Sequence, residues 1–165
     1  MRFKQLLVGF LLVGVVGAGG FFAYRHFVLT SDQCEICGRA VHNAHHSSVI
    51  LKSGRQIDAC CPRCAMHYER NLPGQVARLS VADEVTGHEI EAQSAVYVEG
   101  SDQHPCMSES EMAPREPGVE YDLKFDRCLP SLIAFKDESA AHEYQKEHGG
   151  RLVSFAQALE SVKHR

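Results

Sequence analysis

The sequence predicts an α+β protein, with an N-terminal transmembrane helix followed by two small ββαβ-like subdomains, the first with a cysteine-rich metal knuckle. Three observations support this prediction. An uncharged apolar run lies near the N-terminus, two C-x-x-C steps follow it, and short β-like runs then alternate with amphipathic stripes. We expect a membrane anchor or signal at 1–30, a metal-binding subdomain at 31–100, a linker at 101–120 and a second subdomain at 121–165.

The apolar run Leu6–Tyr24 is about 19 residues long, close to the ~20 that a membrane-spanning helix needs. Arg2 and Lys4 precede it, which favours a single-pass protein of the cytoplasmic membrane with the bulk of the chain on the periplasmic side. A cleaved signal peptide is the alternative, because Gly17–Gly19 offers small residues at a cut site. The retained anchor is preferred because the apolar run continues beyond them to Phe22.

The first subdomain opens with a hairpin signal, because Ser53-Gly54 separates the runs Ser48–Leu51 and Arg55–Ala59. Pro62 suits the first turn of a helix, which we expect to end near Arg70. Further β-like runs are Val76–Val81, Glu89–Ala92 and Ser94–Glu99.

The second subdomain begins with the short apolar strand Ser131–Phe135. Asp137 is expected to cap a helix that ends at Gly149. A strand at Arg151–Val153 follows, and Ser154 then opens an S-x-x-Q capping box for the last helix. Each half has only about 60 residues, a size at which a metal ion helps to stabilise a small core.

The two C-x-x-C steps contain the predicted main metal site, formed by Cys34, Cys37, Cys61 and Cys64. Each step places two thiolates on one tight loop, and two such loops can close a tetrahedron of sulfurs around a soft cation, Cu(I) or Zn(II). Cys61 falls at the start of the predicted helix, where free amides and the helix dipole favour thiolate over thiol.

A fifth thiol, Cys60, adjoins the second step and is expected to act as a substitute ligand for metal exchange. An arrangement in which Cys60 and Cys64 pair with Cys37 resembles the small metal-sensing module called TRASH. Three interpretations stay open: an exchangeable transport site, a closed structural zinc site, and disulfides, which oxidising compartments favour. Seven cysteines fit a simple disulfide framework poorly, because one thiol is left over.

A second group of soft donors is predicted as a secondary or transfer site and comprises His104, Cys106, Met107 and Cys128. Imidazole, thiol and thioether groups on a flexible loop suit Cu(I), a soft ion without strict geometry. The alternative is a Cys106–Cys128 disulfide, which closes a loop of about 20 residues and stabilises the fold by roughly 3 kcal/mol.

Two function classes are disfavoured. After Thr30 the chain has 14 Lys and Arg (17 minus Arg2, Lys4 and Arg25) against 21 Asp and Glu, so a nucleic-acid partner is not expected. We also expect no enzyme, because no Ser-His-Asp pattern, phosphate-binding glycine loop or paired-carboxylate site is evident. A redox role for Cys61 is the least favoured alternative, since a thioredoxin-like motif requires one C-x-x-C in a βαβ context.

Five short segments carry a resemblance to a known family: Cys34–Gly38, Ala95–Ser101, Ala134-Phe135, Ala140-Ala141 and Glu147–Gly150. In these segments the chain resembles the NosL family of extracytoplasmic copper-binding accessory proteins, which are linked to nitrous-oxide reductase maturation. The resemblance implies a pair of small related α+β domains and Cu(I) handling by thiolate and thioether donors.

The chain also departs from the pattern of that family. Arg39 stands where many members carry Met after C-x-x-C-Gly, and the segment beginning at Cys128 replaces a family Met. The typical lipid-modified cysteine is not evident, and the extra cysteines indicate a cysteine-rich branch. We therefore expect a membrane-tethered metal chaperone or trafficking protein that delivers Cu(I) or Zn(II) to an acceptor metalloprotein or metal transporter. A structural zinc-binding interaction module is the alternative.

Overall fold

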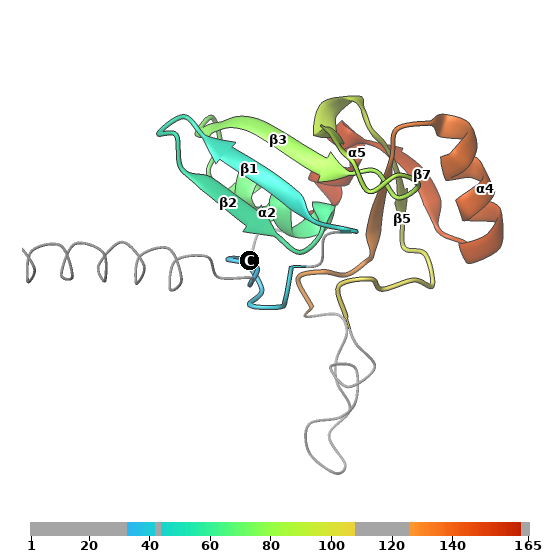
Figure 1. Cartoon of the computed structure of the whole chain (residues 1–165). Coiled ribbons are helices and arrows are strands. Elements are labelled where there is room, and N and C mark those ends of the chain that lie inside the picture. Colours follow the sequence, from blue (N-terminus) through green and yellow to red (C-terminus); the bar gives the residue numbers. More distant parts are fainter. Residues whose placement is uncertain (1–32, 42–43, 108–125, 163–165) are drawn as a thin grey trace, which may run out of the picture. The chain divides into compact units, whose positions relative to one another are not determined.

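The computed structural model describes residues 33–41, 44–107 and 126–162, and Gln33–Arg165 forms one compact unit (Figure 1). Within these residues, two small antiparallel sheets pack with three α-helices, which confirms the predicted α+β class. The predicted membrane anchor lies outside the described residues. No helix in the described ranges is long and apolar enough to cross a membrane.

The first sheet has the strand order β2-β1-β3-β4. The predicted hairpin is confirmed, because β1 (Ser47–Leu51) and β2 (Gln56–Ala59) pair antiparallel. Helix α2 (Pro62–Asn71) follows and packs against both strands, and it begins at the predicted proline. The sheet is completed by β3 (Val76–Ala82), which pairs with β1, and by the short β4 (Glu89–Glu91).

The second sheet repeats this ββαβ order, with β5 at its centre in the order β6-β5-β7. A 3-10 turn, η1 (Ala92–Ser94), leads into β5 (Val96–Glu99). The remaining elements are β6 (Leu132–Phe135), α4 (Glu138–His148), β7 (Arg151–Ser154) and α5 (Phe155–Ser161).

The helix ends of the second half confirm the predicted caps. The Asp137 carboxylate accepts a hydrogen bond from the Ser139 backbone N–H at the start of α4. Ser154 and Gln157 form the reciprocal capping box of α5. These local patterns need only three or four neighbouring residues, so the sequence alone predicts them well.

The position of β5 differs from the expected division of the chain at residue 100. β5 precedes that boundary, yet it pairs with β6 and β7. Its side chains alternate between two cores, because successive residues of a strand point to opposite faces. Tyr97 packs in the main core with the cysteines, whereas Val98 packs in a smaller core with Phe135 and Ala141 of α4. The second sheet therefore has a buried layer on each face.

A buried ion network joins α2 to the second sheet. Glu99, at the end of β5, pairs with Arg63 of α2 at 2.5 Å and with Arg151 of β7 at 2.5 Å. Ser161 of α5 donates a further hydrogen bond to Glu99. The Arg63 guanidinium also donates to the Pro130 carbonyl at 2.8 Å. Because Arg63 is 1% exposed, this network fixes the N-terminal part of α2, where two cysteines lie.

Candidate metal centre

The sulfur cluster is built from four separate parts of the fold and contains all seven cysteines of the chain. Every cysteine is a free thiol, and six are buried while Cys37 is half-buried. The sulfurs form two sets of four, and within each set all sulfurs lie within 4.8 Å of one another. Set A comprises Cys34, Cys37, Cys60 and Cys64, and set B comprises Cys60, Cys61, Cys106 and Cys128.

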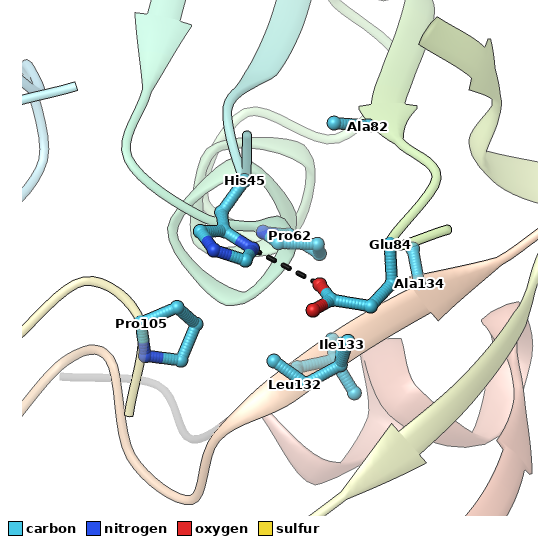
Figure 2. A pocket seen from close by; sticks show the side chains of 8 residues that line it. All are labelled: His45, Pro62, Ala82, Glu84, Pro105, Leu132, Ile133 and Ala134. Carbon is cyan, nitrogen blue, oxygen red and sulfur yellow. Dashed lines mark ion pairs between the residues drawn. The ribbon is translucent and has the colours of Figure 1, made fainter. Parts of the chain in front are cut away.

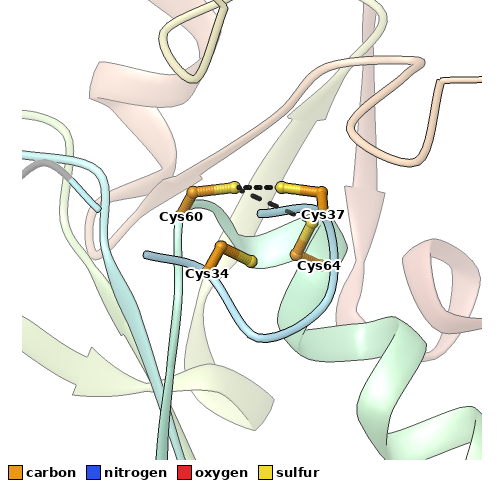
Figure 3. A group of neighbouring side chains, drawn as sticks. All are labelled: Cys34, Cys37, Cys60 and Cys64. Carbon is orange, nitrogen blue, oxygen red and sulfur yellow. Dashed lines mark hydrogen bonds between the residues drawn. The ribbon is translucent and has the colours of Figure 1, made fainter. Parts of the chain in front are cut away.

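The first C-x-x-C step lies on a tight turn before β1. The Cys34 carbonyl accepts the Gly38 N–H at 2.8 Å, and the Cys34 N–H donates to the Arg39 carbonyl at 2.7 Å. Gly38 has a φ of +76°, a conformation that side chains with a Cβ rarely adopt. The turn presents both sulfurs to the start of α2, as Figure 3 shows for set A.

The start of α2 supplies the next three sulfurs. Cys61 is the N-cap residue, in an extended conformation, and its side chain caps no backbone N–H. Cys64 lies at the third helical position, and a helical side chain leans toward the N-terminus of its helix. Its sulfur therefore meets that of Cys60, which precedes the N-cap, at 3.7 Å.

The sulfur positions group the cysteines differently from the predicted main site. The sequence predicts Cys61 in that site and Cys60 as a substitute ligand. Instead, Cys60 lies in set A with the first C-x-x-C step, and Cys61 lies in set B. The reason is the helix start, because the backbone of Cys61 takes the N-cap position while Cys64 leans back toward Cys60.

Only part of the predicted secondary site joins the sulfur cluster. Cys106 and Cys128 join set B. Met107 is buried and packs in the main core with the cysteines. His104 is in neither set, and its buried Nδ1 has no hydrogen-bond partner in the structure. Residues 106 and 107 fall inside the expected linker, yet both are buried.

The sulfur–sulfur distances match those of a metal–thiolate site. A regular tetrahedron with metal–sulfur bonds of about 2.3 Å has edges of about 3.8 Å. Cys60 Sγ lies 3.4 Å from that of Cys37 and 3.8 Å from that of Cys128. Cys128 Sγ lies 3.6 Å from Cys64 and 3.7 Å from Cys37. A disulfide bond requires about 2.05 Å, so these contacts are spaced for a shared cation.

Contacts among the thiols lower the pKa of some cysteines and raise the pKa of others. The contact with Cys37 raises the pKa of Cys34, but hydrogen bonds from Cys60 and Cys64 lower it to about 6. The contact with Cys128 raises the pKa of Cys37, and hydrogen bonds from Cys34 and Cys60 lower it to about 4. Contacts with Cys106 lower the pKa of both Cys61 and Cys128, whereas neighbouring thiols raise the pKa of Cys60, Cys64 and Cys106.

These opposite shifts have one physical cause. A thiol that donates its proton to a neighbouring thiolate stabilises that thiolate and is itself held protonated. Without a cation, crowded thiols cannot all ionise, because each added negative charge repels the others. A bound metal ion supplies the missing positive charge and displaces the remaining protons.

The guanidinium of Arg39 faces the cluster directly. Arg39 donates to Cys128 Sγ at 3.0 Å and forms a two-pronged pair with Asp126 at 2.9 and 2.5 Å. The hydrogen bond to Asp126 raises the pKa of Arg39. Asp126 Oδ1 also accepts the Cys128 N–H at 2.8 Å, so the pair orients Cys128. Sequence analysis missed this role of Arg39 and Asp126, because no local pattern links residues 87 positions apart.

A small pocket lined in part by His45 and Glu84 does not provide room for an organic substrate. His45 Nδ1 lies 3.0 Å from Glu84 Oε2 at its edge, and Pro105 and Leu132 form part of its wall (Figure 2). Its volume of about 10 Å³ corresponds to roughly one water molecule. The sulfur cluster is therefore the stronger candidate for a functional site among the described residues.

No protein-family model matches the chain. Comparisons with curated sequences and with solved structures do find similar proteins. The chain is 26% identical over 145 residues to the HTH-type transcriptional repressor CutR of Bacillus subtilis. That match covers 88% of this chain and 66% of the repressor, so the chain spans just under two thirds of that relative.

Among solved structures, the chain is similar to the crystal structure of the copper chaperone NosL from Shewanella denitrificans, with a TM-score of 0.58 and 18% identity. The match covers 76% of this chain and 87% of that one. It confirms the predicted resemblance at the level of the fold, and membership of that family stays a prediction.

Proposed function

We propose that the chain binds a soft metal ion, Cu(I) before Zn(II), through its thiolates and passes it to an acceptor metalloprotein or a metal transporter. The observation that carries this proposal is the convergence of all seven sulfurs, with neighbouring pairs at 3.4–3.9 Å. Soft thiolates select Cu(I), Zn(II) and similar ions over hard cations. The similarity of the fold to a solved copper chaperone, NosL, favours Cu(I).

The exposure of the ligands supports exchange with a partner. Cys37 is the half-buried member of a cluster whose other sulfurs are buried. A partner thiolate can approach the ion on this side and bind it before Cys37 leaves. Such stepwise exchange avoids releasing a free ion. Membrane tethering on the periplasmic side completes the proposal and rests on the apolar run Leu6–Tyr24.

A structural zinc site is the second candidate. An all-thiolate tetrahedral site with no open position is typical of zinc that stabilises a fold. The deep burial of Cys60 and Cys64 favours this alternative. A structural ion leaves only when the protein unfolds, whereas a transported ion leaves the folded protein. The role of an oxidoreductase is less favoured, because Cys61 is 2% exposed and a disulfide substrate needs access to its sulfur.

The test is an anaerobic Cu(I) titration of the full-length reduced protein against a chromogenic chelator. We expect wild type to withdraw Cu(I) from the chelator and Cys64→Ser to withdraw less. Ser47→Ala is the matched control, because it changes an equally buried small side chain outside the cluster. If wild type withdraws no Cu(I), and withdraws no Zn(II) in a parallel titration against a zinc chelator, the proposal is wrong. Metal loss that occurs only together with unfolding favours the structural zinc site instead.

A further inference from the structure

We infer that the seven cysteines hold two metal ions in one thiolate cluster, with Cys60 as the sulfur that binds both. This inference rests on the proposed metal binding and adds the number of ions and the bridging ligand. Cys60 is the single member common to set A and set B.

The surroundings of Cys60 fit a bridging role. Its sulfur lies 3.4 Å from Cys37 and 3.7 Å from Cys64, both of set A. It also lies 3.8 Å from Cys128 and 3.9 Å from Cys61, both of set B. These distances are close to the edge of about 3.8 Å expected when two sulfurs bind one ion. A thiolate sulfur has three lone pairs, so it can bind an ion on each side.

The number of cysteines agrees with this arrangement. Two four-coordinate ions that share one sulfur require seven sulfurs, which is the cysteine content of the chain. All seven belong to set A or set B. The odd count that fits disulfides poorly is therefore the count that a bridged pair of ions needs.

A single ion leaves part of the cluster unused. An ion bound by set A leaves Cys61, Cys106 and Cys128 outside its coordination, although all three are buried and their sulfurs lie within 4.8 Å of Cys60 Sγ. A second ion binds these three together with Cys60. Each thiol that becomes a ligand releases its proton to solvent, and no electrons are transferred. Arg39, which donates to Cys128, offsets part of the remaining negative charge.

The competing arrangement is one ion at a mixed site. Cys37, Cys60, Cys64 and Cys128 also approach one another, and five of their six sulfur–sulfur distances lie between 3.4 and 3.8 Å. That site binds one ion and excludes Cys34, Cys61 and Cys106. The stoichiometry and the presence of a bridge separate the two arrangements.

The experiment loads the full-length reduced protein with ¹¹³Cd(II), a spectroscopic probe for soft tetrahedral sites, and records ¹¹³Cd NMR spectra. We expect two equivalents to bind and two tetrathiolate resonances to appear, split by mutual scalar coupling through the shared sulfur. Saturation at one equivalent, or two resonances without coupling, overturns the inference. Binding of no ion overturns the proposed function itself, whereas binding of one ion overturns only the two-ion cluster.

Variants assign the ions to their sulfurs. Cys34→Ser changes set A alone and Cys106→Ser changes set B alone, so each should perturb one resonance more than the other. Cys60→Ser should abolish the coupling. Circular dichroism establishes whether each variant is folded, and if Cys60→Ser does not fold, the coupling in wild type decides the result. Equal perturbation of both resonances by Cys34→Ser and by Cys106→Ser contradicts the assignment.

Discussion

Replacing Glu99 by glutamine tests whether the buried ion network holds α2 against the second sheet. The substitution keeps the shape of the side chain and removes its charge. The Glu99 side chain is 3% exposed and pairs with Arg63, which is 1% exposed, at 2.5 Å. In Glu99→Gln the Arg63 guanidinium stays buried without a counterion.

The expected loss of stability is large. Removing one partner of a buried ion pair costs about 3–5 kcal/mol, because the other charge remains uncompensated. Arg151 adds little, since its side chain is 66% exposed and solvent screens its pair with Glu99. Small domains have a total stability of about 5–15 kcal/mol, so the loss is a large fraction of the whole.

The assay is urea unfolding of the full-length, metal-free, reduced protein, followed by circular dichroism. With an m-value on the order of 1–3 kcal/mol/M, the midpoint should fall by about 1 M or more. Glu91→Gln is the matched control, because Glu91 pairs with Arg78 at 2.7 Å while both side chains are about half exposed. That control should lose only about 0–1 kcal/mol. Equal losses in the two variants would refute the reasoning about burial.

Three further predictions concern the pH dependence of stability, the Asp126 side chain that orients Arg39 and Cys128, and the turn at Gly38. Burial raises the pKa of Glu99, but hydrogen bonds from Ser161, Arg63 and Arg151 outweigh it and lower the pKa below 4.5. The stabilisation from Glu99 is therefore present above pH 4.5 and is lost as the pH falls through the folded-state pKa, so acid unfolding of wild type should be steeper than that of Glu99→Gln. Parallel curves would contradict this. Asp126→Asn removes the partner that orients Arg39 and Cys128, and should weaken metal binding by about 10–100-fold in a chelator competition. Asp102→Asn, on an exposed pair with His148, should leave the affinity unchanged, and equal affinities of both variants would argue against a role for Asp126. Gly38→Ala should lose about 1–2 kcal/mol of stability and also metal affinity, because φ at this position is +76°. Gly54→Ala, at a φ of +85° in the β1–β2 hairpin, should lose similar stability and keep its affinity, whereas a matching loss of affinity would show that Gly38 has no special role.

The elements of the fold were predictable where the signal is local. The Ser53-Gly54 turn predicts the first hairpin, Pro62 marks the start of α2, and Ser154 predicts the capping box of α5. Each signal depends on a few neighbouring residues whose backbone conformations are limited. The pairing of β5 was not predictable in this way. Its partners lie after residue 130, and strand pairing depends on contacts between distant segments.

The candidate site was predictable in kind but not in arrangement. The spacing of the cysteines indicates a soft-metal site, and the structure brings all seven sulfurs together. The partition into two sets follows from the backbone at the start of α2, where Cys61 is the N-cap and Cys64 leans back toward Cys60. The pairing of Arg39 with Asp126 has no sequence signal, because it forms between segments that meet only after folding.

The sequence by itself determined which metal-binding donors the protein has and how short its helices and strands are. Only the tertiary structure decided that Cys60 stands between two sets of sulfurs and that a buried arginine and glutamate tie α2 to β5. The physical reason is the distance along the chain over which each feature is determined. Turns and caps are set by the conformations of adjacent residues, whereas a metal site requires distant segments to place their sulfurs within about 4 Å of one another.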